Sequence, residues 1–197
     1  MVAVVENQNV VTRLADNRYR LGMWVALAGI TMLFTGLTSA YIVRTASSND
    51  WQPLGPPPIL FLSTAVIIIS SGTLEIARHS LRAKFTGRSP WLLVTLLFGV
   101  GFLSSQLLAW RQLARQGIYL ASNPHSSFFY LLTATHGFHL LGGLIALAYL
   151  IIRIHQKRSP YQQVTTKDYA IFDAVALYWH FMDALWIYLF LLLFFWR

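Results

Sequence analysis

The chain has 197 residues, of which 56% are hydrophobic and only 11% charged, and its mean hydropathy is positive at +0.53. This composition excludes an ordinary soluble domain, and the absence of cysteine excludes disulfides, thiolate metal sites and haem attachment through cysteine. The formal net charge of +8 would suit nucleic acid, but the basic residues gather between long apolar segments, so we expect a membrane protein with no nucleic-acid partner.

Five apolar segments follow one another, each reaching or approaching the roughly 20 residues that cross about 30 Å of hydrocarbon. They predict an all-α polytopic membrane bundle that forms a single domain, residues 1–197. The expected transmembrane helices are 21–43, 58–80, 91–113, 125–153 and 172–196. The polar start, Met1 to Arg20, lacks the short apolar core and cleavage site of a signal peptide, so we expect nothing to be removed.

The 15 basic residues are divided unevenly between the two sides of this bundle. Four lie on one side: Arg44, Arg111, Arg115 and Arg197. The others lie on the opposite side: Arg13, Arg18, Arg20, Arg78, Arg82, Lys84, Arg88, Arg153, Lys157, Arg158 and Lys167. The positive-inside rule therefore predicts a cytoplasmic N-terminus and a periplasmic C-terminus, in a bacterial inner membrane.

Two connections carry strong turn signals. Residues 45–58 contain four prolines and Gly55, which predicts a stiff, non-helical loop after the first membrane helix. Ser122-Asn123-Pro124 predicts a helix cap followed by proline at the first position of the fourth helix.

A few ionisable side chains fall inside the membrane helices, where each costs roughly 2.5–3.5 kcal/mol on insertion scales and needs a reason. His136 and His139 share one face of the fourth helix, and His180 and Asp183 share one face of the fifth. At about 1.5 Å per residue, His139 is level with His180 and His136 is level with Asp183. We therefore expect the two faces to meet and to hydrogen-bond directly or through water.

The residues alone leave two interpretations of this polar cluster open. Three imidazoles and a carboxylate can bind zinc or iron, which would make the chain a metal-binding membrane enzyme. The other interpretation is a structural clamp that holds two helices together. A pair of bis-histidine haems is excluded, because the fourth helix offers His125 and His139 whereas the fifth offers only His180.

Other polar and aromatic residues suggest contacts rather than chemistry. Glu75 precedes Arg78 and His79 on one face of the second helix, which predicts an interfacial ion pair, with a proton relay as the alternative. Gln106 is expected to join two helices. The residues expected to contact lipid or other subunits are Trp51, Gln106, Trp179 and Trp186. The sequence has no phosphate-binding loop or hydrolase motif, and it lacks the inverted repeat typical of a small transporter.

Two segments of the chain resemble cytochrome c oxidase subunit III. Residues 178–186, YWHFMDALW, resemble the family's last-helix signature YWHFVDxxW, and residues 135–143, THGFHLLGG, resemble its HGxHxxxG segment. Weaker matches in the expected order are Trp51-Gln52-Pro53, Ser71-Gly72 and His79-Ser80-Leu81. The resemblance covers residues 21–197 and is to the five-helix form, which lacks the first two of the seven helices found in longer members.

The resemblance implies a subunit with no catalytic, cofactor-binding or metal-binding residues of its own. It implies a catalytic subunit I as partner, which carries haem and copper, reduces oxygen and pumps protons, within an oxidase and a larger respiratory supercomplex. Support of the catalytic subunit, retention of phospholipid and support of proton uptake are the implied roles. A quinol oxidase subunit III and a nitric oxide reductase accessory protein share this scaffold and remain alternatives.

Two departures limit what the resemblance carries over. Ile30 aligns with a carboxylate that the family places in the first of these five helices, so that residue's role does not transfer. The family's phospholipid cleft lies between the two missing helices and the other five. We therefore expect this cleft to be incomplete or completed by a neighbouring subunit.

Overall fold

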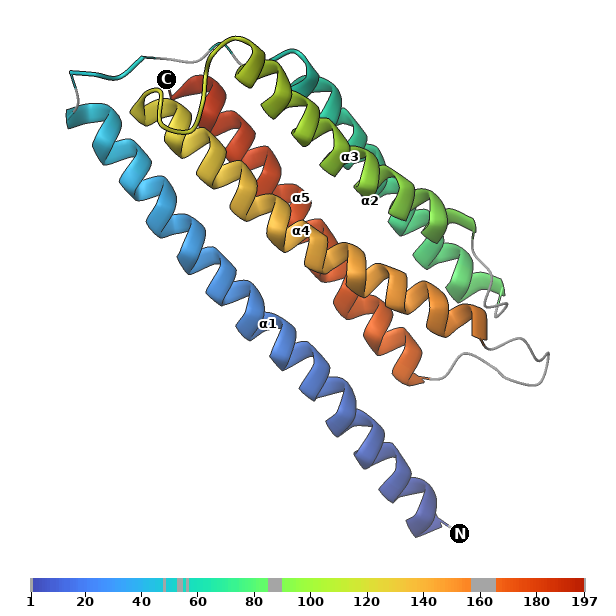
Figure 1. Ribbon diagram of the computed structural model, residues 1–197. Coiled ribbons are helices and arrows are strands. Elements are labelled where there is room, and N and C mark those ends of the chain that lie inside the picture. Colours follow the sequence, from blue (N-terminus) through green and yellow to red (C-terminus); the bar gives the residue numbers. More distant parts are fainter. Residues whose placement is uncertain are drawn as a thin grey trace.

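The computed structural model folds the chain into long α-helices arranged as an antiparallel bundle (Figure 1). It describes residues 2–47, 49–52, 55, 57–84, 90–156 and 166–196, and side chains from residue 21 onward except those of 82–84 and 166. The helices are α1 (Val2–Ser47), α2 (Ile59–Lys84), α3 (Pro90–Arg115), α4 (Pro124–Gln156) and α5 (Thr166–Phe195). All five contain a segment long and apolar enough to cross a membrane, which confirms the expected all-helical membrane architecture.

Two helices begin earlier than the apolar segments suggest. α1 begins at Val2, although its membrane segment is Leu21–Ser47, and α5 begins at Thr166. Neither glycine nor proline interrupts the polar start of α1. Since a helix satisfies its backbone hydrogen bonds internally in water as well as in lipid, it has no reason to end at the membrane surface.

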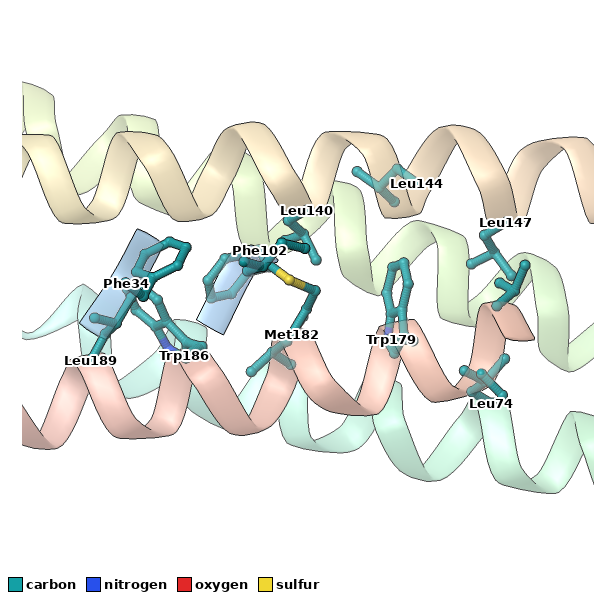
Figure 2. Packing of buried hydrophobic residues seen from close by; sticks show 14 of the residues in the cluster. Phe34, Leu74, Phe102, Leu140, Leu144, Leu147, Trp179, Met182, Trp186 and Leu189 are labelled. Carbon is teal, nitrogen blue, oxygen red and sulfur yellow. The ribbon is translucent and has the colours of Figure 1, made fainter. Parts of the chain in front are cut away.

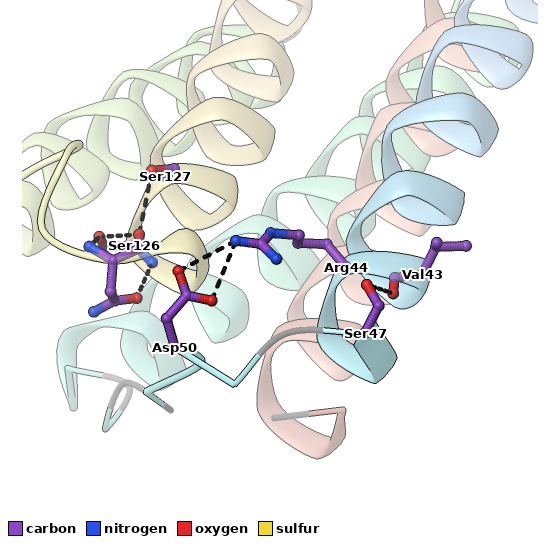
Figure 3. A network of polar contacts seen from close by, with 7 residues as sticks. Val43, Arg44, Ser47, Asp50, Ser126 and Ser127 are labelled. Carbon is purple, nitrogen blue, oxygen red and sulfur yellow. Dashed lines mark hydrogen bonds and ion pairs between the residues drawn. The ribbon is translucent and has the colours of Figure 1, made fainter.

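The cap predicted at the start of α4 is confirmed. Pro124 is the first helical residue, and the backbone N–H of Ser126 donates to Asn123 Oδ1 at 2.9 Å. In return, the Asn123 N–H donates to Ser126 Oγ at 3.1 Å, so each residue satisfies a free backbone donor. Figure 3 shows this network near the end of α1, where Arg44 pairs with Asp50 at 3.1 Å.

The turn between α3 and α4 closes with a glycine in the left-handed region. Gly117 has φ 76°, its N–H donates to the Ala114 carbonyl, and the Ile118 N–H donates to the Leu113 carbonyl, both at 3.0 Å. This pair of bonds is a Schellman motif, which satisfies the last carbonyls of a helix and needs a residue without strain at positive φ.

α4 and α5 are the two central helices of the bundle. The backbone of α5 lies against α1, α2 and α4, and that of α4 lies against α1, α3 and α5. Figure 2 shows Met182 of α5 beside Leu140 of α4, with Trp186 and Leu189 further along α5. In the described part of the chain, α1 contacts α4 and α5 but neither α2 nor α3. α1 and α2 therefore stand on either side of a gap whose floor is α5.

Some residues behind the sequence-based expectations lie outside the described residues or side chains. In the proline-rich loop these are Pro53 and Pro56. Among the basic residues they are Arg13, Arg18, Arg20, Arg82, Lys84, Arg88, Lys157, Arg158 and Arg197.

Candidate functional site

The aromatic residues that open the α5 motif set how closely α5 approaches α3 and α4. The Trp179 ring is fully buried, and a Cβ added at Gly99 of α3 would lie 2.7 Å from its Cη2 atom. A Cβ added at Gly143 of α4 would lie 3.0 Å from the Tyr178 ring. The Tyr178 hydroxyl also donates to the His139 carbonyl at 2.8 Å. Gly99 and Gly143 thus leave room for the rings of Trp179 and Tyr178, as small residues do where membrane helices pack closely.

His180 of α5 points toward α2. Its Nδ1 lies 2.6 Å from Ser71 Oγ, which is a hydrogen bond whichever atom donates. Its Nε2 lies 3.7 Å from Glu75 Oε2, which is an ion pair when the imidazole is protonated. Both ring nitrogens therefore link α5 to α2.

Arg78 extends these polar contacts toward the end of α2. Its guanidinium lies 3.5 Å from Glu75 on the same helix and 2.9 Å from Asp173 on α5, to which Nε also donates at 3.1 Å. His79, which was expected near this pair, is exposed on α2. Asp173 is a member that sequence reasoning missed, because that reasoning compared neighbours on one helix.

The two histidines of α4 lie among apolar and aromatic groups. His136 is only 1% exposed, and within the described residues neither of its ring nitrogens has a hydrogen-bond partner. The centroid of its ring lies 5.2 Å from that of Trp186 and 5.9 Å from that of Phe102. His139 Nδ1 lies 2.8 Å from the carbonyl of Thr135, on its own helix. The rings of these two histidines thus pack rather than bridge to α5.

Asp183 is buried one turn beyond His180 on α5. It is 4% exposed, and neither carboxyl oxygen has a hydrogen-bond partner within the described part of the chain. The Ser71 hydroxyl of α2 lies near this carboxyl but makes no hydrogen bond to it in the structure. A buried polar group without a partner is costly, so this residue needs an explanation.

The expected polar cluster of α4 and α5 is therefore divided among different surroundings. Direct pairing of His139 with His180, and of His136 with Asp183, was expected from matched depth, whereas the structure turns His180 toward α2 and encloses His136 in rings. The direct form of this prediction was wrong for the described side chains, because depth along a helix does not fix the rotation of the helix about its axis, and pairing through water stays a prediction.

Two of the residues expected to contact lipid or other subunits are buried inside the chain instead. Trp179 is 0% and Trp186 is 1% exposed. The Trp186 indole N–H donates to Thr64 Oγ1 of α2 at 3.0 Å. Their large rings therefore fill the space between helices, which corrects the expectation for both.

The other two expected contact residues also have partners within the chain. Gln106 Nε2 of α3 donates to Ser63 Oγ of α2 at 3.0 Å, so it joins two helices. Trp51, in the loop after α1, is half-buried, and its ring centroid lies 5.2 Å from that of Tyr41 and 5.1 Å from that of His125.

A second ion pair between helices escaped the sequence analysis. Arg153 Nε of α4 lies 2.8 Å from Asp168 Oδ1 of α5, whose side chain is 1% exposed. The available signal was a basic residue in the last turn of one helix and an acidic residue in the first turn of the next. The pair closes the α4–α5 interface at this end.

Ile30, which aligns with the family's carboxylate, lies in apolar surroundings. It is 8% exposed and belongs to the same hydrophobic core as Phe34 of α1 and Phe102 of α3. This part of α1 therefore contributes packing at the position that the family resemblance associates with a carboxylate.

The gap between α1 and α2 contains a cavity of about 440 Å³ over the floor formed by α5. Arg78 lines it from α2, and Trp24 lines it from α1. Asp173 and His180 line it from the floor, where alanines keep it open. Polar and ionisable groups thus face a space large enough for several water molecules.

The side chains at this site can exchange protons and hold helices together. Within the described ranges, no group of three or more histidine, aspartate or glutamate residues is arranged to hold a metal ion. The connected set runs from Asp173 through Arg78 and Glu75 to His180 and Ser71. We call these five residues the polar ladder.

Comparison with known proteins identifies the relatives of the chain. The family model for cytochrome c oxidase subunit III matches residues 5–197. A probable cytochrome c oxidase subunit 3 of Nocardia farcinica is 34% identical over 186 residues, covering 92% of this chain and 89% of the relative. A cytochrome c oxidase subunit 3 of Bacillus sp. PS3 is 31% identical over 174 residues, covering 86% and 82%. A quinol oxidase subunit 3 of Bacillus subtilis is 32% identical over 174 residues, covering 86% and 83%.

Proposed function

The chain belongs to the cytochrome c oxidase subunit III family and is a subunit III of a haem-copper oxidase, and from this we propose that it supports the catalytic subunit without a redox centre of its own. These matches do not favour a nitric oxide reductase accessory protein or a metal-binding membrane enzyme. The proposed work is to cover one flank of the catalytic subunit, to retain phospholipid and to sustain proton uptake.

One observation carries this proposal: Tyr178 and His180 of the α5 motif bind other helices of the same chain. His180 pairs with Ser71 and Glu75, and Tyr178 with the His139 carbonyl. Interhelical hydrogen bonds of this kind hold membrane bundles together. The motif therefore supplies a rigid bundle, and oxygen reduction belongs to a partner that holds haem and copper.

The multi-pass chain is proposed to lie in a bacterial inner membrane with its N-terminus in the cytoplasm. Arg78 and Arg153, with Lys167, lie where α2 and α4 end and α5 begins, which we call the basic end of the bundle. Cytoplasmic loops are enriched in such residues. The basic end is therefore assigned to the cytoplasm.

The outer face of α1 is the proposed contact with other subunits. In its membrane segment 22% of the residues are buried, against 33–39% in the other four segments. A partner helix on this face would take the place of the two helices found in longer family members. The catalytic subunit is the proposed main partner, within an oxidase and a larger respiratory assembly.

A groove between α1 and α5 is the proposed place for phospholipid. It has a volume of about 260 Å³, and Phe34, Phe181, Leu185 and Tyr188 are among the residues that line it. Its lining is mainly apolar, as an acyl chain requires. Retained lipid here would keep α1 packed against α5.

Cytochrome c and quinol are both candidate electron donors to the complex, because relatives carrying each name match at similar identity. Purified complex that oxidises reduced cytochrome c but not quinol would assign the first, and the reverse would assign the second.

The proposal is tested by purifying the complex in mild detergent through a tag on this chain. We expect a catalytic subunit with haem and copper to co-purify, identified by mass spectrometry and visible absorption. Complex depleted of this chain should begin turnover at the normal rate and then lose activity, and adding the chain back should prevent the loss. Recovery of the chain alone, or unchanged durability without it, would contradict the proposal.

A further inference from the structure

The polar ladder and the buried Asp183 form a graded series along the bundle. Asp173 and Arg78 lie nearest the basic end, and His180 with Ser71 lies deeper. Asp183 lies about 24 Å from the start of the α5 membrane segment at about 1.5 Å per residue, close to its middle. The series therefore reaches from one membrane surface to mid-depth.

Several ladder side chains are partly exposed as well as paired with one another. The side chain of His180 is 38% exposed and that of Glu75 is 55% exposed, although both belong to membrane segments. Ionisable groups at such depth line water-filled cavities or pair with one another. Here they do both, since His180, Arg78 and Asp173 line the cavity of about 440 Å³ between α1 and α2.

The opposite side of Asp183 is closed. Trp186, one turn further along α5, is 1% exposed and packs against the Phe102 ring at a centroid distance of 4.9 Å. Met182 and Leu189 are both 0% exposed. Toward the basic end, Asp183 is thus followed by the polar ladder. In the opposite direction along α5 it is followed by buried apolar and aromatic side chains.

We propose that the polar ladder and its cavity conduct protons between the basic end of the bundle and Asp183, which makes Asp183 a buried proton-storage site open to one side of the membrane. The inference deepens the proposed support of proton uptake and rests on it for its biological meaning. With the basic end in the cytoplasm, the stored proton comes from the cytoplasm.

The geometry supports a balanced transfer of single protons. His180 accepts a proton at Nε2 from Glu75 or cavity water and releases the proton on Nδ1 to Ser71 Oγ, 2.6 Å away. In the proposed last step the Ser71 hydroxyl turns toward an ionised Asp183, passes its own proton to that carboxylate and keeps the one received. Each cycle moves one proton and no electrons, and the reverse sequence returns it.

The groups that face this route come from two helices. On α2 they are Ser71, Glu75 and Arg78, and on α5 they are Tyr169, Asp173, His180 and Asp183. The residues of α1 that line the cavity, Met23 and Trp24, do not titrate. The proposed route therefore depends on polar groups of α2 and α5.

Infrared difference spectroscopy of the intact oxidase complex tests the proposal. Asp183→Asn, or Asp183→Glu as the milder change, identifies the carboxyl band of Asp183 in the wild-type spectrum. Ser71→Ala should slow hydrogen–deuterium exchange of that band by about tenfold or more, because the last hydroxyl of the route is lost. Ser70→Ala is the matched control: Ser70 is buried on α2 but donates to the Thr95 carbonyl of α3, so exchange should not change.

The side of access is tested in vesicles that hold the complex in one orientation. After a pH step at the basic end, the Asp183 band should change in wild-type complex and lag in Ser71→Ala. A band that follows the pH of the opposite side, the absence of any carboxyl band assignable to Asp183, or equal exchange in wild type and Ser71→Ala would each overturn the proposal. Failure would leave co-purification with the catalytic subunit, and hence the proposed function, untouched.

Discussion

α5 has two different interfaces with the other helices, and residues of its motif, 178–186, contribute to both. Toward α3 and α4 it is dry: Trp179 packs on Gly99, and His136 lies among rings without a hydrogen-bond partner in the described residues. Toward α2 it is polar and open to a cavity, with His180 between Ser71 and Glu75. His136 and His180 therefore have different roles: the ring of His136 fills space between helices, whereas the ring nitrogens of His180 bind α2.

The largest expected effect breaks the dry interface. In Gly99→Val the new side chain would meet Trp179 and Leu144, since even a Cβ lies 2.7 and 2.8 Å from them. Overpacking of this kind costs about 1–3 kcal/mol or more. We expect the subunit to dissociate from the complex at lower temperature, measured by heating the detergent-solubilised complex and weighing the released chains by mass spectrometry.

Gly101→Val is the matched control for this change. Gly101 lies two residues further along α3, and a Cβ there has nothing within 4 Å. Its dissociation temperature should equal that of wild type. Equal lowering in both variants would show that valine in α3, rather than contact with Trp179, causes the loss.

The next largest effect compares the two kinds of histidine. His180→Leu removes the hydrogen bond to Ser71 and leaves Ser71 and Glu75 without that partner, which we expect to cost about 1–3 kcal/mol. His136→Leu removes a polar ring that has no hydrogen-bond partner among the described residues, so its effect should be near zero or stabilising.

Both histidine variants are measured by the denaturant concentration at which the subunit unfolds in mixed micelles. A larger loss for His136→Leu than for His180→Leu would contradict the division into a dry and a polar interface. It would place the important hydrogen bonds on α4.

The smallest effect is expected for Tyr178→Phe, which separates the packing of the ring from the hydrogen bond of its hydroxyl. Tyr178→Phe keeps the ring against Gly143 but removes the hydrogen bond to the His139 carbonyl. Interhelical hydrogen bonds in membranes average about 0.6 kcal/mol, so we expect a loss of that size in the same unfolding assay. A loss as large as that of Gly99→Val would mean that the hydroxyl, and not the ring, sets the α4–α5 distance.

Much of the fold could be predicted from the sequence, because hydrocarbon thickness and helix rise fix the length of a span. The five membrane segments were predicted from their length and apolar composition. The cap at Asn123 and Pro124 was predicted from a local residue pattern. The α1 start at Val2 was missed, because apolar patterning marks the membrane and not the end of the helix.

The site could be predicted only in part. Family motifs pointed to His180 and Asp183, but which neighbour each one faces depends on the rotation of α5 and on its contacts with three helices. That information is distributed over the whole packing arrangement. Asp168 and Asp173 were missed for the same reason, since each finds its arginine on another helix.

The most direct test of the central claim is the behaviour of His180→Leu during turnover. We expect assembled complex with this change to show wild-type haem absorption and initial oxygen consumption, and then to lose activity faster than wild type over repeated turnovers. The His180 side chain would then act by holding α2 to α5. A changed or missing haem signal in fully assembled complex would contradict this account, because it would place His180 at a redox centre.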